Sequence, residues 1–371
     1  MKYKKFVIMV LVYIAIVLMN IIIYSCERNN NCGIYNLFHG KSKIIIELNE
    51  IKRILIYIFM GICFGIIYKI LDKIQIIVKI NKKEILKVRK DFIWWMLAIY
   101  IVITCCTFFR SYIVQLNINT IRNLINEDKV IVHALGFIEG GVDKKVYSYT
   151  NSKEALINSY SFGNRIFEVD FCFTSDNALV CAHNGNSWVA GIETEGILSE
   201  KDFLNQKIYG YFTPMSLDDL AEFMIENEEM YVVTDIKSIV PNANYNGCKY
   251  IKDNYPQLQD RFIIQIYHID EYEPIKKEGF NNIIFTLYET SETERKPEVL
   301  KENFDKYDLL GLTFWDSWCY GEWFEQIKEL NVPLYIHTVN DKNEMISAYK
   351  KGISAIYTDN VVNEWIKKED Y

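Results

Sequence analysis

The sequence predicts an α/β protein in which three transmembrane α-helices precede a (β/α)8 barrel of the TIM type. Two observations support this prediction. Three long apolar runs fill the first 114 residues of the 371-residue chain, and short β-branched or aromatic runs then alternate with amphipathic stretches. The predicted domains are therefore a membrane region over residues 1–120 and a barrel over residues 121–371.

The apolar runs are close in length to the roughly 20 residues that cross a bilayer. The runs from Phe6 to Tyr24 and from Phe92 to Phe109 carry no charge, and the run from Ile54 to Tyr68 is shorter. The alternatives are buried core helices and, for the first run, a cleaved signal peptide, whose apolar core would be shorter. The expected spans are about residues 6–25, 52–71 and 92–113.

Basic residues decide the predicted orientation. They cluster before the first span and between the second and third, and the positive-inside rule places both segments in the cytoplasm. We therefore expect a multi-pass protein of the cell membrane with an extracytoplasmic barrel, and three spans would also allow an oligomer formed through the helices. The basic residues are Lys2, Lys4, Lys5, Lys73, Lys79, Lys82, Lys83, Lys87, Arg89 and Lys90.

Charge changes at the same boundary. Residues 1–120 contain 17 Lys and Arg against 6 Asp and Glu, whereas residues 121–371 contain 24 against 42. The membrane topology explains the basic part. The acidic part argues against a nucleic-acid partner, which would need a basic face. The nine cysteines include no CxxC pair, so we expect no structural zinc site.

Eight strand-like runs follow Leu124, with amphipathic stretches between them. Eight strands alternating with helices over roughly 245 residues have the size and order of a (β/α)8 barrel. A doubly wound open sheet is the alternative, but the sequence has no glycine fingerprint for it. Residues 184–214 interrupt the pattern and are expected to form an insertion over one mouth of the barrel. The expected strands are Val130–Ala134, Ile166–Cys172, Tyr231–Asp235, Phe262–Tyr267, Asn282–Leu287, Leu309–Phe314, Pro333–His337 and Ala355–Thr358, and the amphipathic stretches include Leu217–Glu229, Lys296–Phe304 and Asp341–Lys351.

Two carboxylates stand inside one of these apolar strands, at Glu168 and Asp170. Side chains alternate along a strand, so both point to the same face. Adjacent buried carboxylates repel each other and are costly to desolvate, and a divalent cation between them removes both costs. The turn at 175–177 then returns an apolar strand that is expected to end at His183, which would bring the imidazole near the carboxylates.

Other polar residues stand where further predicted strands end. In a barrel of this kind, the carboxyl ends of the strands form the mouth that carries the active site. Polar side chains that recur at one end of successive apolar strands therefore indicate a site. They are His133, Asp235, Lys237, Trp315, His337 and Asp359.

The order of these motifs resembles the glycerophosphodiester phosphodiesterase family, within the phospholipase C-like phosphodiesterase barrels. The resemblance covers about residues 130–362, and its most specific part is the block FEVDFCFTSDNALVCAH at 167–183. The other matching segments are His133 with Gly136, YTNSKEAL at 149–156, VVTDIKS at 232–238, HTVND at 337–341 and GISAIYTDN at 352–360.

The resemblance implies a metal-dependent phosphoric diester hydrolase. Glu168, Asp170 and Asp235 would hold one divalent cation, Ca²⁺ or Mg²⁺, which oxygen ligands suit. Asp235 stands where most members have glutamate. His133 and His183 would form the acid/base pair, one deprotonating the nucleophile and the other protonating the leaving alcohol.

Several residues are expected to support this chemistry. Lys237 matches the family's lysine beside the third metal ligand and would neutralise a phosphate oxygen. We expect Trp315 and His337 to contact the substrate, and we expect Asn151 and Glu154 to cap or brace a helix near the site.

Two departures from the family pattern leave the substrate open. Ala134 stands where the family has an arginine that would hold the phosphate, and Asn184 stands where it has an aspartate. The main hypothesis is hydrolysis of glycerophosphodiesters, derived from deacylated phospholipids or a glycerol-phosphate polymer, to glycerol phosphate and an alcohol. The alternatives are an enzyme acting on intact lipid headgroups, similar to sphingomyelinase D or a phospholipase, and a non-catalytic barrel that binds phosphodiesters.

Overall fold

The computed structural model describes residues 118–141, 144–183, 188–189, 192–193, 196–237 and 241–360. The chain divides into two compact units, Met1–Leu116 and Asn117–Tyr371, and the described residues all belong to the second. None of the helices in this described part has the length and apolar character needed to cross a bilayer. The three predicted spans lie outside the described residues.

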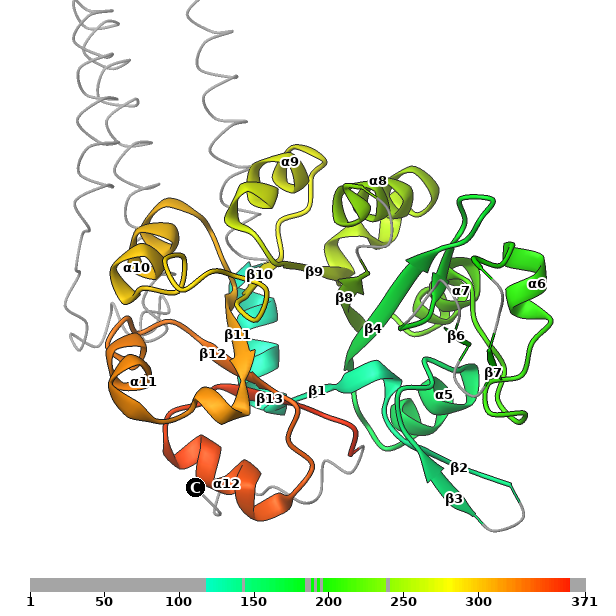
Figure 1. The fold of residues 1–371 in the computed structure, drawn as a ribbon, viewed down its shortest axis with the longest axis horizontal. Helices are drawn as coiled ribbons and strands as arrows, with labels where there is room; N and C mark the ends of the chain where they lie inside the picture. The colour runs from blue at the N-terminus through cyan, green and yellow to red at the C-terminus, as the bar shows by residue number, and fades with distance from the viewer. Residues whose placement is uncertain are drawn as a thin grey trace, which may run out of the picture. The chain divides into compact units, whose positions relative to one another are not determined.

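Eight parallel strands close into a barrel (Figure 1). The closing contact is made by β1, which pairs with β13 on one side and with β4 on the other. This closure confirms the predicted (β/α)8 barrel and excludes the open sheet, and each of the eight predicted runs overlaps one strand of the barrel. The strands are β1 (Val130–Val132), β4 (Ile166–Phe173), β8 (Tyr231–Ile236), β9 (Phe262–Ile266), β10 (Ile283–Thr286), β11 (Gly311–Trp315), β12 (Leu334–His337) and β13 (Ala355–Thr358).

Helices surround the barrel, and side-chain hydrogen bonds define several of their ends. At the start of α7, the Ser216 hydroxyl accepts a bond from the backbone N–H of Asp219, and the Asp219 carboxylate accepts one from the backbone N–H of Ser216. This capping box begins the helix where the sequence pattern places it. The helices are α5 (Lys153–Ser161), α6 (Glu200–Leu204), α7 (Leu217–Glu226), α8 (Ala243–Asn254), α9 (Tyr272–Lys277), α10 (Pro297–Lys306), α11 (Gly321–Lys328) and α12 (Lys342–Lys350).

Short strands extend the barrel on one side. The antiparallel strand β5 (Leu179–Cys181) returns along β4, as the turn at 175–177 predicts, but it ends two residues before His183. The insertion contributes the small sheet of β6 (Trp188–Val189) with β7 (Ile192–Glu193). A second hairpin, β2 (Ile138–Gly140) with β3 (Lys145–Tyr147), precedes α5.

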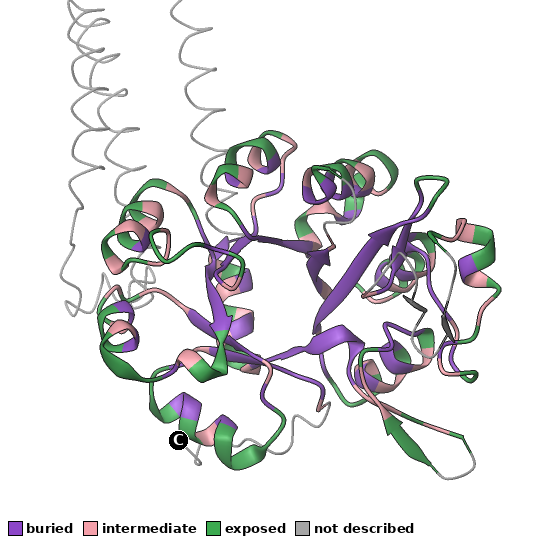
Figure 2. Ribbon diagram, in the orientation of Figure 1, coloured by how far each residue is buried: buried purple, intermediate pink, exposed green. Residues whose placement is uncertain are grey.

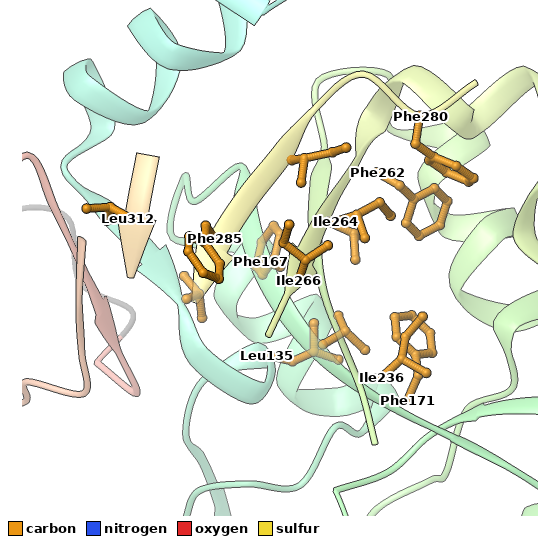
Figure 3. Close-up of a cluster of buried hydrophobic side chains, with 14 of the residues drawn as sticks. Leu135, Phe167, Phe171, Ile236, Phe262, Ile264, Ile266, Phe280, Phe285 and Leu312 are labelled. Carbon is orange, nitrogen blue, oxygen red and sulfur yellow. The ribbon is translucent and has the colours of Figure 1, made fainter. Parts of the chain in front are cut away.

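The barrel strands are buried along almost their whole length (Figure 2). On β4, Phe167 and Phe171 belong to the apolar cluster that the strands share with the helices (Figure 3), whereas Glu168 and Asp170 occupy the opposite face. Both faces are buried. The prediction that the two carboxylates share one face of this strand is therefore confirmed.

Polar groups fill part of the barrel interior. The side-chain oxygen of Gln265 accepts hydrogen bonds from the hydroxyls of Thr286 and Tyr357, each at 3.1 Å. All three side chains are almost completely buried. The interior is therefore a packed core and not a channel.

A helix over residues 118–128 closes the end of the barrel at which the strands begin. Its residues Ile121 and Ile125 are fully buried. The guanidinium of Arg122 donates from Nη2 to the carbonyl oxygen of Leu309 at 2.9 Å and from Nε to that of Leu310 at 3.4 Å. These two carbonyls directly precede β11, so the helix lies across the floor of the barrel and the opposite mouth carries the site.

We expect Arg122→Ala to destabilise the barrel by about 1–3 kcal/mol, because two buried carbonyl groups lose a charged hydrogen-bond donor. Urea unfolding of the full-length chain, followed by near-ultraviolet circular dichroism, measures the free energy of unfolding. Lys301→Ala, at an exposed position of α10, is the control and should change it by less than about 0.5 kcal/mol. Equal effects of the two substitutions would show that the hydrogen bonds of Arg122 contribute little to stability.

Candidate active site

A cavity of about 140 Å³ opens at the mouth where the parallel strands end. Seven of the ten predicted site residues line it, which places them at one location although they come from six different strands and the segments that follow them. The lining residues are His133, Tyr149, Asp170, His183, Asp235, Ile236, Lys237, Tyr267, Tyr288, Glu289, Trp315 and His337.

Three carboxylates gather beside this cavity. One ligand oxygen each from Glu168, Asp170 and Asp235 lies within 4.8 Å of the other two, and all three residues are buried. The parallel register sets Asp170 of β4 directly beside Asp235 of β8. In addition, Oε1 of Glu168 is buried without a hydrogen-bond partner. A cluster of buried oxygen ligands with an unsatisfied oxygen fits a hard divalent cation.

The ammonium group of Lys237 contacts two of these carboxylates. Its Nζ lies 2.7 Å from Oδ1 of Asp170 and 2.8 Å from Oδ2 of Asp235. Burial alone would lower the pKa of Lys237, but the charges of the two aspartates raise it above its ordinary value. Lys237 therefore stays charged. Two of its three N–H groups point to carboxylates, which leaves one for a ligand in the cavity.

Asn151 and Glu154 act as braces at two different places. The side-chain amide of Asn151 donates to Oδ2 of Asp170 at 2.8 Å, and its oxygen accepts the backbone N–H of Asp170 at 3.1 Å. The carboxylate of Glu154 instead accepts two hydrogen bonds from Thr213 in the insertion, each at 2.8 Å. The residue that caps α5 is Ser152. Asn151 thus fixes a site carboxylate, whereas Glu154 holds the insertion against α5.

A carboxylate orients His133, which directly follows β1. Nδ1 of His133 lies 2.8 Å from Oδ1 of Asp359, and the side-chain amide of Asn340 donates to Oδ2 of the same aspartate at 2.7 Å. Nε2 is left facing Glu168, whose Oε2 is 4.0 Å away. Burial alone would lower the pKa of His133, but the bond to Asp359 and the charge of Glu168 raise it to about 9.

The two predicted catalytic histidines share an aromatic neighbour. The ring of Tyr149 stands edge-on to His133, with ring centroids 4.3 Å apart, and edge-on to His183, with centroids 5.1 Å apart. His183 therefore lies at the same cavity although its own strand ends earlier, and Tyr149 contacts both imidazoles.

Four further aromatic residues line the cavity. Tyr267, Tyr288, Trp315 and His337 stand at or just after the ends of β9, β10, β11 and β12. Four lining residues with side chains capable of polar or ring contact were not predicted from the sequence: Tyr149, Tyr267, Tyr288 and Glu289. The signal that could identify two of them is position, because Tyr267 ends a predicted strand and Tyr288 directly follows one.

His337 is neutral in this setting. Burial lowers its pKa to about 3, and the neighbouring His133 adds to the effect. Its Nε2 is buried without a hydrogen-bond partner. These properties suit the expected substrate contact and do not suit a proton donor.

Ala134 stands where the family has an arginine, and it makes a different contact in this chain. Ala134 has a φ of +45°, which is the left-handed region and is uncommon for residues other than glycine. This conformation directs its backbone N–H to Oε2 of Glu168, at 2.6 Å. The position therefore orients a carboxylate and supplies no cationic side chain. Asn184, the second departure, lies outside the described residues.

Solved structures share this barrel. A protein of Galdieria sulphuraria, described as a glycerophosphodiester phosphodiesterase, matches with a TM-score of 0.52 at 14% identity, over 64% of this chain and 97% of its own. The barrel has the glycerophosphodiester phosphodiesterase fold. An Oleispira antarctica phosphodiesterase, in complex with the product sn-glycerol-3-phosphate, shares this fold with a TM-score of 0.50 at 14% identity, over 64% of this chain and 94% of its own.

The fold thus agrees with the resemblance that the sequence motifs indicate. No protein-family model matches the chain, and no curated protein matches its sequence. At this low identity the agreement concerns the fold, and the roles of the site residues stay predictions.

We expect Glu168→Gln to weaken the binding of Ca²⁺ or Mg²⁺ at least about tenfold, because it removes a charged ligand and keeps the shape of the side chain. Isothermal titration calorimetry of the full-length chain measures the affinity. The control, Asp176→Asn, changes a carboxylate in the exposed turn between β4 and β5 and should leave the affinity unchanged. Equal affinities for the two variants would contradict a metal site at Glu168.

Cation binding should also depend on pH. Burial raises the pKa of Glu168, and the charge of Asp170 raises it further. Without a cation, Glu168 therefore keeps its proton where an exposed glutamate has lost it, and a cation must displace that proton. We expect affinity to increase from about pH 6 to about pH 8, with protons released on binding. Titrations in two buffers of different ionisation enthalpy count those protons, and a pH-independent affinity would contradict the expectation.

Proposed function

We propose that this chain is a metal-dependent phosphodiesterase that hydrolyses glycerophosphodiesters to glycerol phosphate and an alcohol. One observation carries the proposal: two histidines, a lysine and a cluster of three buried carboxylates meet at the strand-end mouth of the barrel. The glycerophosphodiester phosphodiesterase fold supports it, as does the sn-glycerol-3-phosphate bound to the Oleispira antarctica phosphodiesterase.

The chemistry requires charge neutralisation at the phosphoryl oxygens, a deprotonated nucleophile and a protonated leaving group. Glu168, Asp170 and Asp235 would hold the cation, which supplies Lewis-acid polarisation of a phosphoryl oxygen when it is bound. Lys237 contributes a second positive charge. Its remaining N–H donates to a phosphate oxygen, and this contact matters more here because Ala134 provides no cationic side chain.

The two histidines divide the proton transfers. Asp359 accepts a hydrogen bond from Nδ1 of His133 and so stabilises the imidazolium form. We therefore assign to His133 the protonation of the departing alkoxide through Nε2. His183 accepts the proton of the nucleophile, which is either water or the neighbouring hydroxyl of the glycerol group. In the second case a cyclic phosphate forms and is then hydrolysed.

The proposed enzyme works outside the cell and is held at the membrane. This part of the proposal rests on the three apolar runs and on the basic residues that set their orientation. Oligomerisation through the helices is a further prediction from the same apolar runs. The orientation is tested with an epitope placed after Tyr371, which is detected in intact and in permeabilised cells. An epitope accessible only after permeabilisation would contradict the predicted orientation.

We expect the full-length chain to release glycerol phosphate from glycerophosphodiesters in the presence of Ca²⁺ or Mg²⁺ and not in EDTA. His183→Ala should lower kcat by about 10²–10⁴-fold, the usual contribution of general acid–base catalysis. His268→Gln, at a half-exposed histidine outside the cavity, should leave kcat unchanged. Absence of turnover with the cation bound would exclude soluble diesters and direct attention to intact lipid headgroups or to a binding role.

A further inference from the structure

We propose that the aromatic side of the cavity, formed by Tyr267, Tyr288, Trp315 and His337, binds a leaving group that carries a quaternary ammonium, of which choline is the simplest example. This aromatic wall is defined by those four residues. The inference rests on the proposed function and adds to it the class of alcohol that is released.

The rings of the aromatic wall form a continuous surface. The centroids of Tyr288 and Trp315 are 4.8 Å apart, those of Trp315 and His337 are 5.5 Å apart, and those of Tyr267 and Tyr288 are 5.4 Å apart. The planes of Trp315 and His337 are nearly perpendicular, at 87°. Rings set at such angles present their faces from more than one direction, as is required to surround a cation.

Trp315 is partly open to solvent at the mouth. Its side chain is 39% exposed although it ends a barrel strand whose preceding four residues are buried. The exposed part of this residue does not stabilise the fold by burial. It lines the cavity and is available to a ligand.

The charges on this side of the cavity favour a cation. Of the residues that line the cavity, the carboxylate beside the wall is Glu289, which follows Tyr288 directly and is exposed at the rim. Lys237, the lining residue with a permanent positive charge, is held by Asp170 and Asp235, and Asp235 also accepts a hydrogen bond from the hydroxyl of Tyr267 in the wall. His337 is uncharged because burial lowers its pKa. The aromatic wall thus combines negative ring faces with an acidic rim.

The position of the wall also agrees with the chemistry. His337 links the two sides, since its ring centroid is 4.8 Å from that of His133 and 5.5 Å from that of Trp315. An alcohol that leaves a phosphate beside His133 is therefore directed toward the wall. A trimethylammonium group has no N–H to donate, so recognition depends on ring faces and on the acidic rim. A neutral polyol would instead need a set of hydrogen-bond partners.

The first test compares two substrates with the full-length chain. We expect kcat/KM for glycerophosphocholine to exceed that for glycerophosphoglycerol at least about tenfold, as one desolvated cation–π contact supplies. Trp315→Leu keeps an apolar side chain without the ring face and should remove this preference, whereas Trp315→Phe should retain part of it. Tyr320→Ala, at a tyrosine that is 74% exposed and does not line the cavity, is the matched control and should retain all of it.

The second test does not require turnover. Calorimetric titration with tetramethylammonium chloride should show binding to the unmodified chain and to Tyr320→Ala, and binding weakened at least about tenfold in Trp315→Leu. Failure to hydrolyse any glycerophosphodiester would contradict the proposed function, and the titration would still decide on the ammonium subsite. Equal kcat/KM for the two substrates, a preference that survives in Trp315→Leu, or no binding of tetramethylammonium would overturn the inference.

Discussion

The site depends on the burial of three carboxylates at the end of two neighbouring strands. Glu168, Asp170 and Asp235 repel one another in a low-dielectric environment, and leaving them uncompensated would cost several kcal/mol. Lys237 offsets part of this cost, because its ammonium lies within 2.8 Å of both aspartates. Glu168 receives less compensation, because one of its oxygens has no partner. This imbalance makes a bound cation favourable.

Neighbouring groups fix Asp170, Glu168 and His133 in place. Asn151 holds Asp170 through two hydrogen bonds, and the backbone of Ala134 holds Glu168. Asn340 holds Asp359, which in turn orients His133. The side chains that would react with a substrate are therefore supported by residues that do not face the cavity, as preorganised catalytic groups require.

The sequence predicts the architecture well, since strand alternation and strand spacing are local properties. The eight strands and the shared face of Glu168 and Asp170 follow from period and order alone. The hydrogen bond between His133 and Asp359 does not follow from period and order, because it joins residues 226 positions apart. The closure of the barrel brings these two residues together. The position of Tyr288 directly after a predicted strand indicates the mouth of the barrel, but one tyrosine there does not distinguish a cavity wall from ordinary packing. The helix end at Glu226, three residues before the predicted one, depends on the Asn227 side chain, which bonds back to Phe223.

The closed floor of the barrel restricts the geometry of any long substrate. Arg122 ties the helix over residues 118–128 across the end where the strands begin, and Gln265 and Tyr357 occupy the space above it. A polymeric phosphodiester therefore cannot thread through the barrel. It can only present a chain end, or a bent segment, at the single mouth, and both products must leave by the route through which the substrate arrived. Cleavage of a polymer by this site would therefore occur at a chain end or at a bent segment, and not along an extended stretch.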